Sequence, residues 1–139
     1  MALTRQQGVA LARAHVLAER DGDIEATLAT LDADPLYELL PVGRALRGLD
    51  GARRYYEHFF ASFRALAVSS ELRGEWVNDV GLAHEYTIGV ALPDGSRERH
   101  RLVAILTFGA SGLAGERVYA SERLLRLMFG PAFELAVPI

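Results

Sequence analysis

The chain has 139 residues, half of them hydrophobic, and a formal net charge of −3, which predicts one domain over residues 1–139 with enough apolar side chains for a core. It contains no cysteine, which excludes disulfides, thiolate nucleophiles and thiolate metal sites. All fifteen basic residues are arginine, and the lack of lysine excludes Schiff-base catalysis and a phosphate loop of the Gly-Lys-Ser/Thr type.

Two helices are predicted at the start of the chain. Apolar residues at helical spacing predict the first over about residues 5–20, and Asp21-Gly22 ends it. Asp23 is expected to cap a short second helix, because its side chain can accept a hydrogen bond from the first turn. Asp34-Pro35 is expected to stop that helix, since the residue before a proline is pushed out of the α region.

A short strand and a third helix are predicted next. Residues 36–40 are strand-like and run into Pro41, and a loop with two glycines follows. Asp50 is expected to cap the third helix, whose apolar stripe includes Tyr55, Tyr56, Phe59, Phe60 and Phe63. A stripe this broad must be covered over most of the helix circumference.

The second half of the chain is predicted to be a meander of antiparallel strands, at residues 72–80, 82–92, 97–108 and 116–121. Pro93-Asp94-Gly95 forms a turn between two of them, and residues 122–129 are expected to finish as a helical turn or tail. Helices followed by a strand meander indicate the α+β class. Gly74, Gly81 and Gly89 are positions at which a strand can bend.

Five short motifs lie within residues 5–128: Gly22-Asp23, Asp34-Pro35-Leu36-Tyr37, Pro41-Val42-Gly43, Gly48 before the Tyr55-Tyr56 helix, and Arg117-Val118-Tyr119. Together they resemble the nuclear transport factor 2-like superfamily, in particular its SnoaL-like polyketide cyclase and ketosteroid isomerase branches. The resemblance implies a cone, in which a curved antiparallel sheet wraps around N-terminal helices as a cystatin-like α+β barrel. A pocket is expected at its open end, and members are often dimers.

The resemblance also implies where relatives keep their catalytic groups. The base carboxylate of the isomerases corresponds to Leu40, and their protonated carboxyl corresponds to Ala104. Their oxyanion tyrosine corresponds to His15, and the aspartate of the cyclases corresponds to Ser121. The inherited mechanisms therefore lack both a base and a proton donor in this chain.

The same resemblance sets the strand faces, because side chains alternate along a strand. The residues expected inside the cone are Leu36, Glu38, Leu40, Glu85, Thr87, Gly89, His100, Leu102, Ala104, Leu106, Arg117, Tyr119 and Ser121. The residues expected on the outer face are His84, Tyr86, Ile88, Val90, Leu92, Val103 and Ile105. We predict a homodimer through this outer face, since a monomer rarely exposes so large an apolar surface. A one-residue slip in register would invert every assignment.

Two carboxylates are candidate general bases. Glu38 stands between apolar residues, where burial would raise its pKa; the alternative is a rim carboxylate that is solvated or paired with an arginine such as Arg44. Glu85 lies in the middle of a strand, and its alternative is a cross-strand ion pair with Arg101 or Arg99.

His15 is the candidate proton donor, because it stands where the family keeps a tyrosine; a hydrogen-bonded core histidine is the alternative. Residues expected to contact the ligand are Leu40, Tyr56, Phe60, Trp76, His100, Ala104, Tyr119 and Ser121. The aromatic members of this set can equally serve as core residues. Histidine pairs with metal-ligand spacing are absent from the sequence, so no metal and no cofactor are expected.

Two hypotheses for function stay open. In the first, the protein binds a small apolar molecule and acts as an isomerase, cyclase or lyase by proton transfer, with Glu38 or Glu85 as base and His15 as donor. In the second, it is a non-catalytic ligand-binding or dimeric assembly module of the same fold.

Other partners are not expected. The arginines are scattered rather than gathered into a basic surface, which argues against nucleic acid. No window reaches about 18 uncharged apolar residues, so no membrane span is expected. Residues 1–8 lack the pattern of a secretory signal, and a cytoplasmic location is expected.

Overall fold

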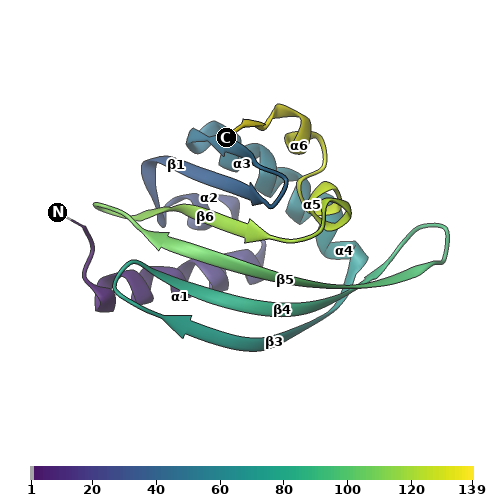
Figure 1. Ribbon diagram of the computed structural model, residues 1–139, viewed down its shortest axis with the longest axis horizontal. Helices are drawn as coiled ribbons and strands as arrows, with labels where there is room; N and C mark the ends of the chain where they lie inside the picture. The colour runs from purple at the N-terminus through teal and green to yellow at the C-terminus, as the bar shows by residue number, and fades with distance from the viewer. Residues whose placement is uncertain (1) are drawn as a thin grey trace.

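The helices pack against one face of a curved seven-stranded sheet (Figure 1). The computed structural model describes residues 2–139, so Met1 of the predicted domain lies outside the described residues. The helices are α1 (Arg5–Asp21), α2 (Ile24–Leu28), α3 (Gly48–His58), α4 (Arg64–Leu66), α5 (Glu122–Phe129) and α6 (Pro131–Leu135), with a π-helical turn at Phe59–Phe63. The strands are β1 (Leu31–Leu40), β2 (Arg44–Arg47), β3 (Ala67–Val77), β4 (Gly81–Ala91), β5 (Arg97–Phe108), β6 (Leu113–Tyr119) and β7 (Val137–Pro138).

The strand order is β3-β4-β5-β6-β1-β2-β7. Strands β3 to β6 form the predicted antiparallel meander, and β1 joins it through a parallel pairing with β6. The sheet is curved and does not close, and the helices occupy its hollow. This is the predicted α+β cone, with one parallel strand pair that the prediction of an antiparallel sheet did not include.

The first helix begins and ends at the predicted residues, and the second begins at the predicted cap. Thr4 caps α1 in a reciprocal capping box with Gln7, and Gly22 ends the helix with a positive φ of 70°. Asp23 caps α2 by accepting a hydrogen bond of 3.0 Å from the backbone N–H of Ala26. These local signals place His15 on a well-defined helix at the wall of the cone.

Two predicted boundaries are wrong. Asp34-Pro35 does not stop a helix, because α2 has already ended at Leu28 and the pair lies inside β1, where the pairing with β6 is irregular. Asp50 does not cap the third helix, which begins at Gly48 with Arg47 at the N-cap and no side-chain cap. Asp50 lies in the first turn instead, where a carboxylate is favourable near the positive end of the helix dipole.

The predicted strand faces are wrong by one residue in three of four strands. Leu36, Glu38, Leu40, Glu85, Thr87, Gly89, Arg117 and Tyr119 lie on the outer face. The inner face instead carries Tyr37, Leu39, Leu82, His84, Tyr86, Ile88, Val90, Glu116 and Val118. The predicted faces of β5 are correct: Leu102, Ala104 and Leu106 lie on the inner face, and Val103 and Ile105 lie on the outer face. The physical reason is that the buried Val118 of β6 faces inward and pairs with Leu39 of β1 and Ala104 of β5. Ala104 in turn pairs with His84 of β4, so the pairing places these residues on the inner face.

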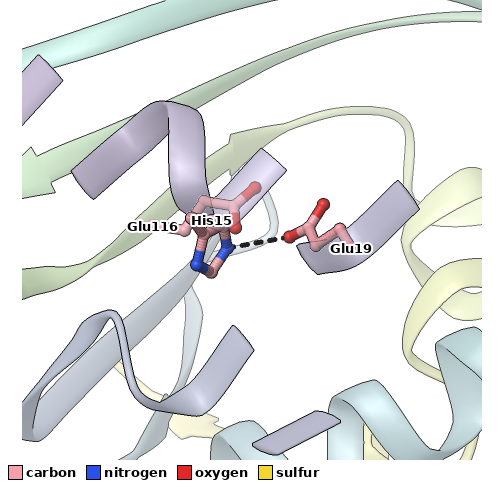
Figure 2. Close-up of side chains that lie close together, drawn as sticks. All are labelled: His15, Glu19 and Glu116. Atoms are coloured by element: carbon pink, nitrogen blue, oxygen red, sulfur yellow. Dashed lines mark ion pairs between the residues drawn. The ribbon is translucent and has the colours of Figure 1, made fainter. Parts of the chain in front are cut away.

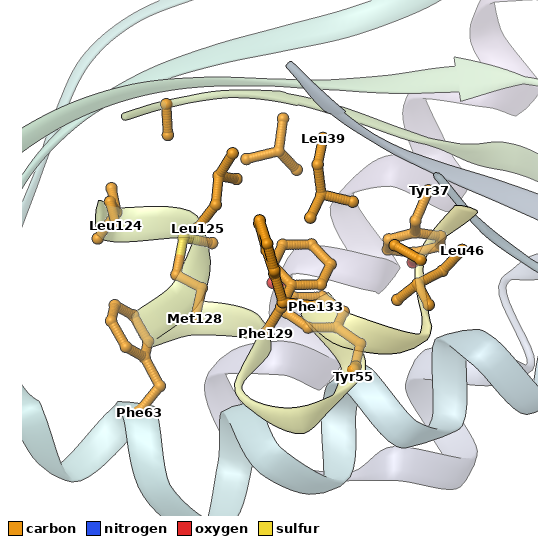
Figure 3. Close-up of a cluster of buried hydrophobic side chains, with 14 of the residues drawn as sticks. Tyr37, Leu39, Leu46, Tyr55, Phe63, Leu124, Leu125, Met128, Phe129 and Phe133 are labelled. Atoms are coloured by element: carbon orange, nitrogen blue, oxygen red, sulfur yellow. The ribbon is translucent and has the colours of Figure 1, made fainter. Parts of the chain in front are cut away.

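The main core joins α3, α5 and α6 to the inner face of β1 and β2 (Figure 3). Phe129 is fully buried and stacks on Tyr55, with 4.0 Å between the ring centroids and 15° between the planes. The predicted C-terminal tail is therefore a structural closure, because its two helices pack against α3 and complete this core. The part of the chain that the structure describes contains no helix both long and apolar enough to cross a membrane.

Truncation of this closure should be costly. Phe129→Ala is expected to lower the free energy of unfolding by about 3–5 kcal/mol, because it removes a stacked ring and leaves a cavity. Urea denaturation measures the change, and Leu135→Ala in the next helix, α6, at a half-exposed residue, is the control that should stay close to wild type. A loss below about 1 kcal/mol for Phe129→Ala would contradict the assigned role.

Candidate functional site

A cavity of about 730 Å³ lies between α1, the π-helical turn and the inner face of strands β3 to β6. Its wall is mainly apolar and includes Phe59, Phe63, Leu72, Ile88, Leu102 and Met128. Sites for small molecules have this size and this kind of lining, with a few polar groups that fix orientation. Two polar groups of side chains reach this cavity, one at α1 and β6 and the other at β3 and β4.

The first polar group is built on one face of α1. His15 and Glu19 lie four residues apart, so their side chains meet on the same face of the helix. The imidazole Nε2 of His15 and Oε1 of Glu19 are 2.8 Å apart. Figure 2 shows this pair together with the Glu116 carboxyl, which approaches the ring from β6.

Two tyrosines extend this network into the core. The hydroxyl of Tyr56 lies 2.9 Å from His15 Nε2 and 3.0 Å from Glu19 Oε1. The hydroxyl of Tyr37 lies 2.6 Å from that of Tyr56. Both tyrosines are fully buried, and burial raises the pKa of each well above its usual range. They stay protonated, so Tyr56 donates to Glu19 and Tyr37 donates to the oxygen of Tyr56.

Thr30 fixes which ring nitrogen of His15 carries a proton. Its hydroxyl donates to the carbonyl oxygen of Thr27 at 2.7 Å, so it can only accept from His15 Nδ1, which is 2.7 Å away. Nδ1 is therefore protonated, and the contact between Nε2 and Glu19 requires one further proton between them. Burial lowers the pKa of His15, but the charge and hydrogen bond of Glu19 outweigh it and raise that pKa overall. The pair is an imidazolium and a carboxylate.

Glu116 is the most unusual residue of the cavity. It is 7% exposed, and its Oε2 has no hydrogen-bond partner among the described residues. Burial, reinforced by the nearby charge of Glu19 and opposed by that of His15, raises the pKa of Glu116 to about 8. At neutral pH this residue is an uncharged carboxylic acid that can donate a proton into the cavity.

The same three residues are the group with metal-ligand spacing in the described part of the chain. The ligand atoms of His15, Glu19 and Glu116 all lie within 4.8 Å of one another. A cation there would have to displace the proton shared by His15 and Glu19 and ionise Glu116. The hydrogen bonds to Thr30 and the tyrosines require these protons to be present, so the three residues fit an acid–base cluster better than a metal site.

The second polar group lies on the inner face of β3 and β4. Glu75 Oε2 is 2.7 Å from His84 Nε2, and the hydroxyl of Tyr86 is 3.1 Å from His84 Nδ1. Arg13 of α1 donates a hydrogen bond to each oxygen of the Glu75 carboxylate, at 2.9 and 2.8 Å. Hydrogen bonds from Arg13 and then from His84 lower the pKa of Glu75 to about 2, so it is a carboxylate at any ordinary pH.

Both predicted bases lie outside the cavity. Glu38 makes an ion pair of 3.0 Å with Arg117, and Glu85 makes one of 3.3 Å with Arg101. Both residues therefore adopt the ion-pair alternative. Glu85 pairs with Arg101, and Glu38 pairs with Arg117 of the neighbouring strand instead of Arg44. Both lie on the outer face because their strands have the opposite register from the one predicted.

Of the predicted ligand contacts, Ala104 lines the cavity and Tyr56 reaches it through His15. Trp76 and Tyr119 lie on the outer face, with 57% and 43% of their surfaces exposed. Leu40 lies beside Tyr119 on that face. These three do not line the cavity, because their strand faces are inverted.

The other predicted contacts have structural partners. Ser121 caps α5 by accepting a hydrogen bond of 3.1 Å from the backbone N–H of Leu124. His100 pairs with Glu98 at 2.8 Å, and Phe60 stacks on Tyr56 with 5.5 Å between ring centroids. Sequence reasoning missed Glu19, Glu116, His84 and Tyr86. The four-residue spacing from His15 could have identified Glu19, and the apolar alternation of Val118 and Ala120 could have identified Glu116.

No family model and no curated protein matches this sequence. Solved structures do match. A protein from Xanthomonas campestris named a "putative polyketide cyclase" is 20% identical, with a TM-score of 0.67 over 91% of this chain and 98% of that one. An NTF2-like protein of unknown function from Burkholderia pseudomallei is 13% identical, with a TM-score of 0.66 over 88% and 97%. Likeness at these identities shows the fold.

The protonation of Glu116 should be visible in the pH dependence of stability. A carboxyl whose pKa is higher in the folded state stabilises below its unfolded value of 4.5, and this contribution is lost as pH rises to about 8. His15, with its raised pKa, acts in the same direction. Stability is therefore expected to fall from pH 5 to pH 8, and Glu116→Gln should flatten this decline in urea unfolding.

The matched control is Glu85→Gln, whose carboxylate lies on the outer face beside Arg101. It should keep the wild-type slope of stability against pH. An equally steep decline in Glu116→Gln and wild type would show that Glu116 is not the buried acid.

Proposed function

We propose that this chain, which has the nuclear transport factor 2-like fold, binds a small, mainly apolar molecule in its cavity. The molecule carries a carbonyl or phenolic oxygen. Glu116 donates a hydrogen bond or a proton to that oxygen, and the positive charge of the His15 imidazolium, whose two N–H groups donate to Thr30 and Glu19, favours negative charge there. The observation that carries the proposal is the buried, uncharged Glu116 carboxyl with an unpaired oxygen at the wall of a 730 Å³ cavity. A polar group without a protein partner is costly unless a ligand or water satisfies it.

The chemistry supported best is proton transfer next to a carbonyl group. A neutral carboxylic acid in an apolar site stabilises the negative charge that develops on oxygen when a carbon–hydrogen bond breaks. Isomerase, cyclase and lyase reactions can all pass through such an enolate. A structural neighbour carries the name polyketide cyclase, which is consistent with this reaction class.

The roles within the site differ from those expected from the sequence. His15 is no longer proposed as a direct donor, because its two N–H groups donate to Thr30 and Glu19; it supplies the positive charge of an imidazolium beside Glu116. Glu38 and Glu85 are not proposed as bases, because both lie on the outer face in ion pairs. Glu116 takes the donor role that the resemblance assigned to the position of Ala104.

We also propose that two copies of the chain pair through the outer face of the sheet. Val103 and Ile105 lie there as expected, next to Tyr119 and Trp76, whereas the other residues predicted for this face line the interior. The ion pairs of Glu38 and Glu85 flank this apolar area with both signs of charge. Such a surface suits the self-complementary contact of a two-fold dimer.

Binding of 4-nitrophenol tests the role of Glu116, because its phenolate absorbs visible light and its oxygen mimics an enolate. Glu116→Leu should weaken binding of the phenolate about ten-fold or more, since it removes a hydrogen bond to a charged oxygen. Treatment with a chelator should leave binding unchanged. Glu85→Leu on the outer face is the control and should bind like wild type. Equal affinity of wild type and Glu116→Leu would contradict the proposal.

Light scattering after size exclusion tests the dimer. Wild-type protein at micromolar concentration should have twice the mass of one chain, and Ile105→Arg should yield a monomer because it places charge in the apolar contact. Leu135→Ala, at a half-exposed residue away from the sheet face, should stay dimeric. A monomeric wild-type protein would refute the pairing.

A further inference from the structure

Three side chains on the inner face of β3 and β4 form a continuous hydrogen-bonded chain that the proposed function does not use. Glu75 contacts His84 Nε2 at 2.7 Å, and His84 Nδ1 contacts the hydroxyl of Tyr86 at 3.1 Å. All three line the same cavity as Glu116. A carboxylate, an imidazole and a hydroxyl in this order form the arrangement by which enzymes activate a hydroxyl group.

The direction of each hydrogen bond follows from the charge of Glu75. Arg13 holds both of its oxygens, so Glu75 is a carboxylate and can only accept. His84 Nε2 must therefore donate to Glu75. In the neutral imidazole, Nδ1 is then unprotonated and accepts the proton of the Tyr86 hydroxyl. The tautomer of His84 is thus fixed by a surface arginine acting through a carboxylate.

We propose that Tyr86 is the catalytic residue that removes a proton from a carbon next to the substrate carbonyl, with His84 and Glu75 as positioning residues. The inference rests on the proposed function, in which Glu116 donates to the carbonyl oxygen. It specifies the substrate class as a ketone or a related carbonyl compound with an acidic carbon–hydrogen bond. Arg13 completes the set by holding Glu75 in place.

The proposed step is balanced in atoms and charge. The carbon–hydrogen bond breaks and its proton goes to the Tyr86 oxygen, while the Tyr86 proton moves to Nδ1 of His84. The resulting imidazolium lies against the Glu75 carboxylate. The electron pair of the broken bond moves onto the carbonyl oxygen, which takes the proton of Glu116. The product is an enol, and reversal of the proton transfers at the same or another carbon restores the protein.

Two observations support a concerted transfer. Burial, followed by the charges of Glu19 and Glu116, raises the pKa of Tyr86, so a free tyrosinate does not form and the proton leaves only as His84 accepts it. The two polar groups also have opposite roles: Glu116 is a neutral donor, and Glu75 is an anion that supports a base. Because the pKa of one group is raised and that of the other is lowered, the cavity provides an acid and a base at the same pH.

The sheet leaves room for a substrate between these groups. Ala104 of β5 pairs with His84 of β4 on one side and with Val118 of β6 on the other. Its small side chain lines the cavity between the strand that carries Tyr86 and the strand that carries Glu116. A substrate lying over Ala104 would reach both polar groups.

Deuterium exchange into 2-indanone in D₂O, followed by proton NMR, tests the step. Wild type should accelerate exchange of the protons next to the carbonyl over buffer. Tyr86→Phe should lose about ten-fold or more of that acceleration while it still binds 2-indanone, because only the hydroxyl is removed. Tyr119→Phe, the same change on the outer face, should retain the wild-type rate.

Glu75 and His84 are tested by measurements that would not change if these residues only supported the fold. Glu75→Gln should shift the pH profile of exchange, because the imidazolium formed on His84 loses its carboxylate partner. His84→Asn should lower the exchange rate with little change in 2-indanone binding. Nitrogen NMR of the imidazoles should find the Nε2–H tautomer at His84 in wild type.

The outcomes separate this inference from the proposed function. Binding of 2-indanone that depends on Glu116, with no exchange in wild type or full exchange in Tyr86→Phe, would overturn the role of Tyr86 alone. If 2-indanone does not bind, the proposed function fails for this class, and the His84 tautomer still decides whether the hydrogen-bonded chain is oriented as described. An Nδ1–H tautomer would overturn it.

Discussion

Burial of the Glu116 carboxyl in a mainly apolar cone sets the electrostatics of the whole cavity. An ionised carboxylate at this position would lie close to Glu19 and away from water, so the proton stays on Glu116. The remaining negative charge of Glu19 is matched by the imidazolium of His15, which Thr30 and the tyrosines hold in one orientation. One desolvated group thereby fixes the charge state of its neighbours.

Helix α1 connects the two sides of the cavity. It supplies His15 and Glu19 to the acidic group, and two residues before His15 it supplies Arg13, which holds Glu75 on β3. The curved sheet brings β4 and β6 to opposite sides of Ala104, so both polar groups face the same space. The fold thus places a donor and an anion-supported imidazole in one cavity.

The sequence predicted the fold well because its signals are local: Asp23 and Gly22 mark helix ends, and the strand meander has clear turns. It predicted the strand faces poorly. In β1, Leu36, Tyr37, Leu39 and Leu40 are all apolar, so alternation alone does not choose a face. Tyr37 is buried only because β1 pairs with β6 in the register that faces Val118 inward. That pairing joins segments far apart in the sequence. It explains why Glu38 and Glu85 lie outside the cavity and Glu116 lies inside it, opposite to the prediction.

Infrared spectroscopy measures the charge of Glu116, on which the electrostatics of the cavity depend, without any ligand. A protonated, buried carboxylic acid has a C=O stretch separate from the bands of carboxylates. At pH 7 the wild-type protein should show this band, Glu116→Gln should lack it, and it should disappear as pH passes about 8. A Glu116 that absorbs as a carboxylate at pH 7 would contradict the central claim.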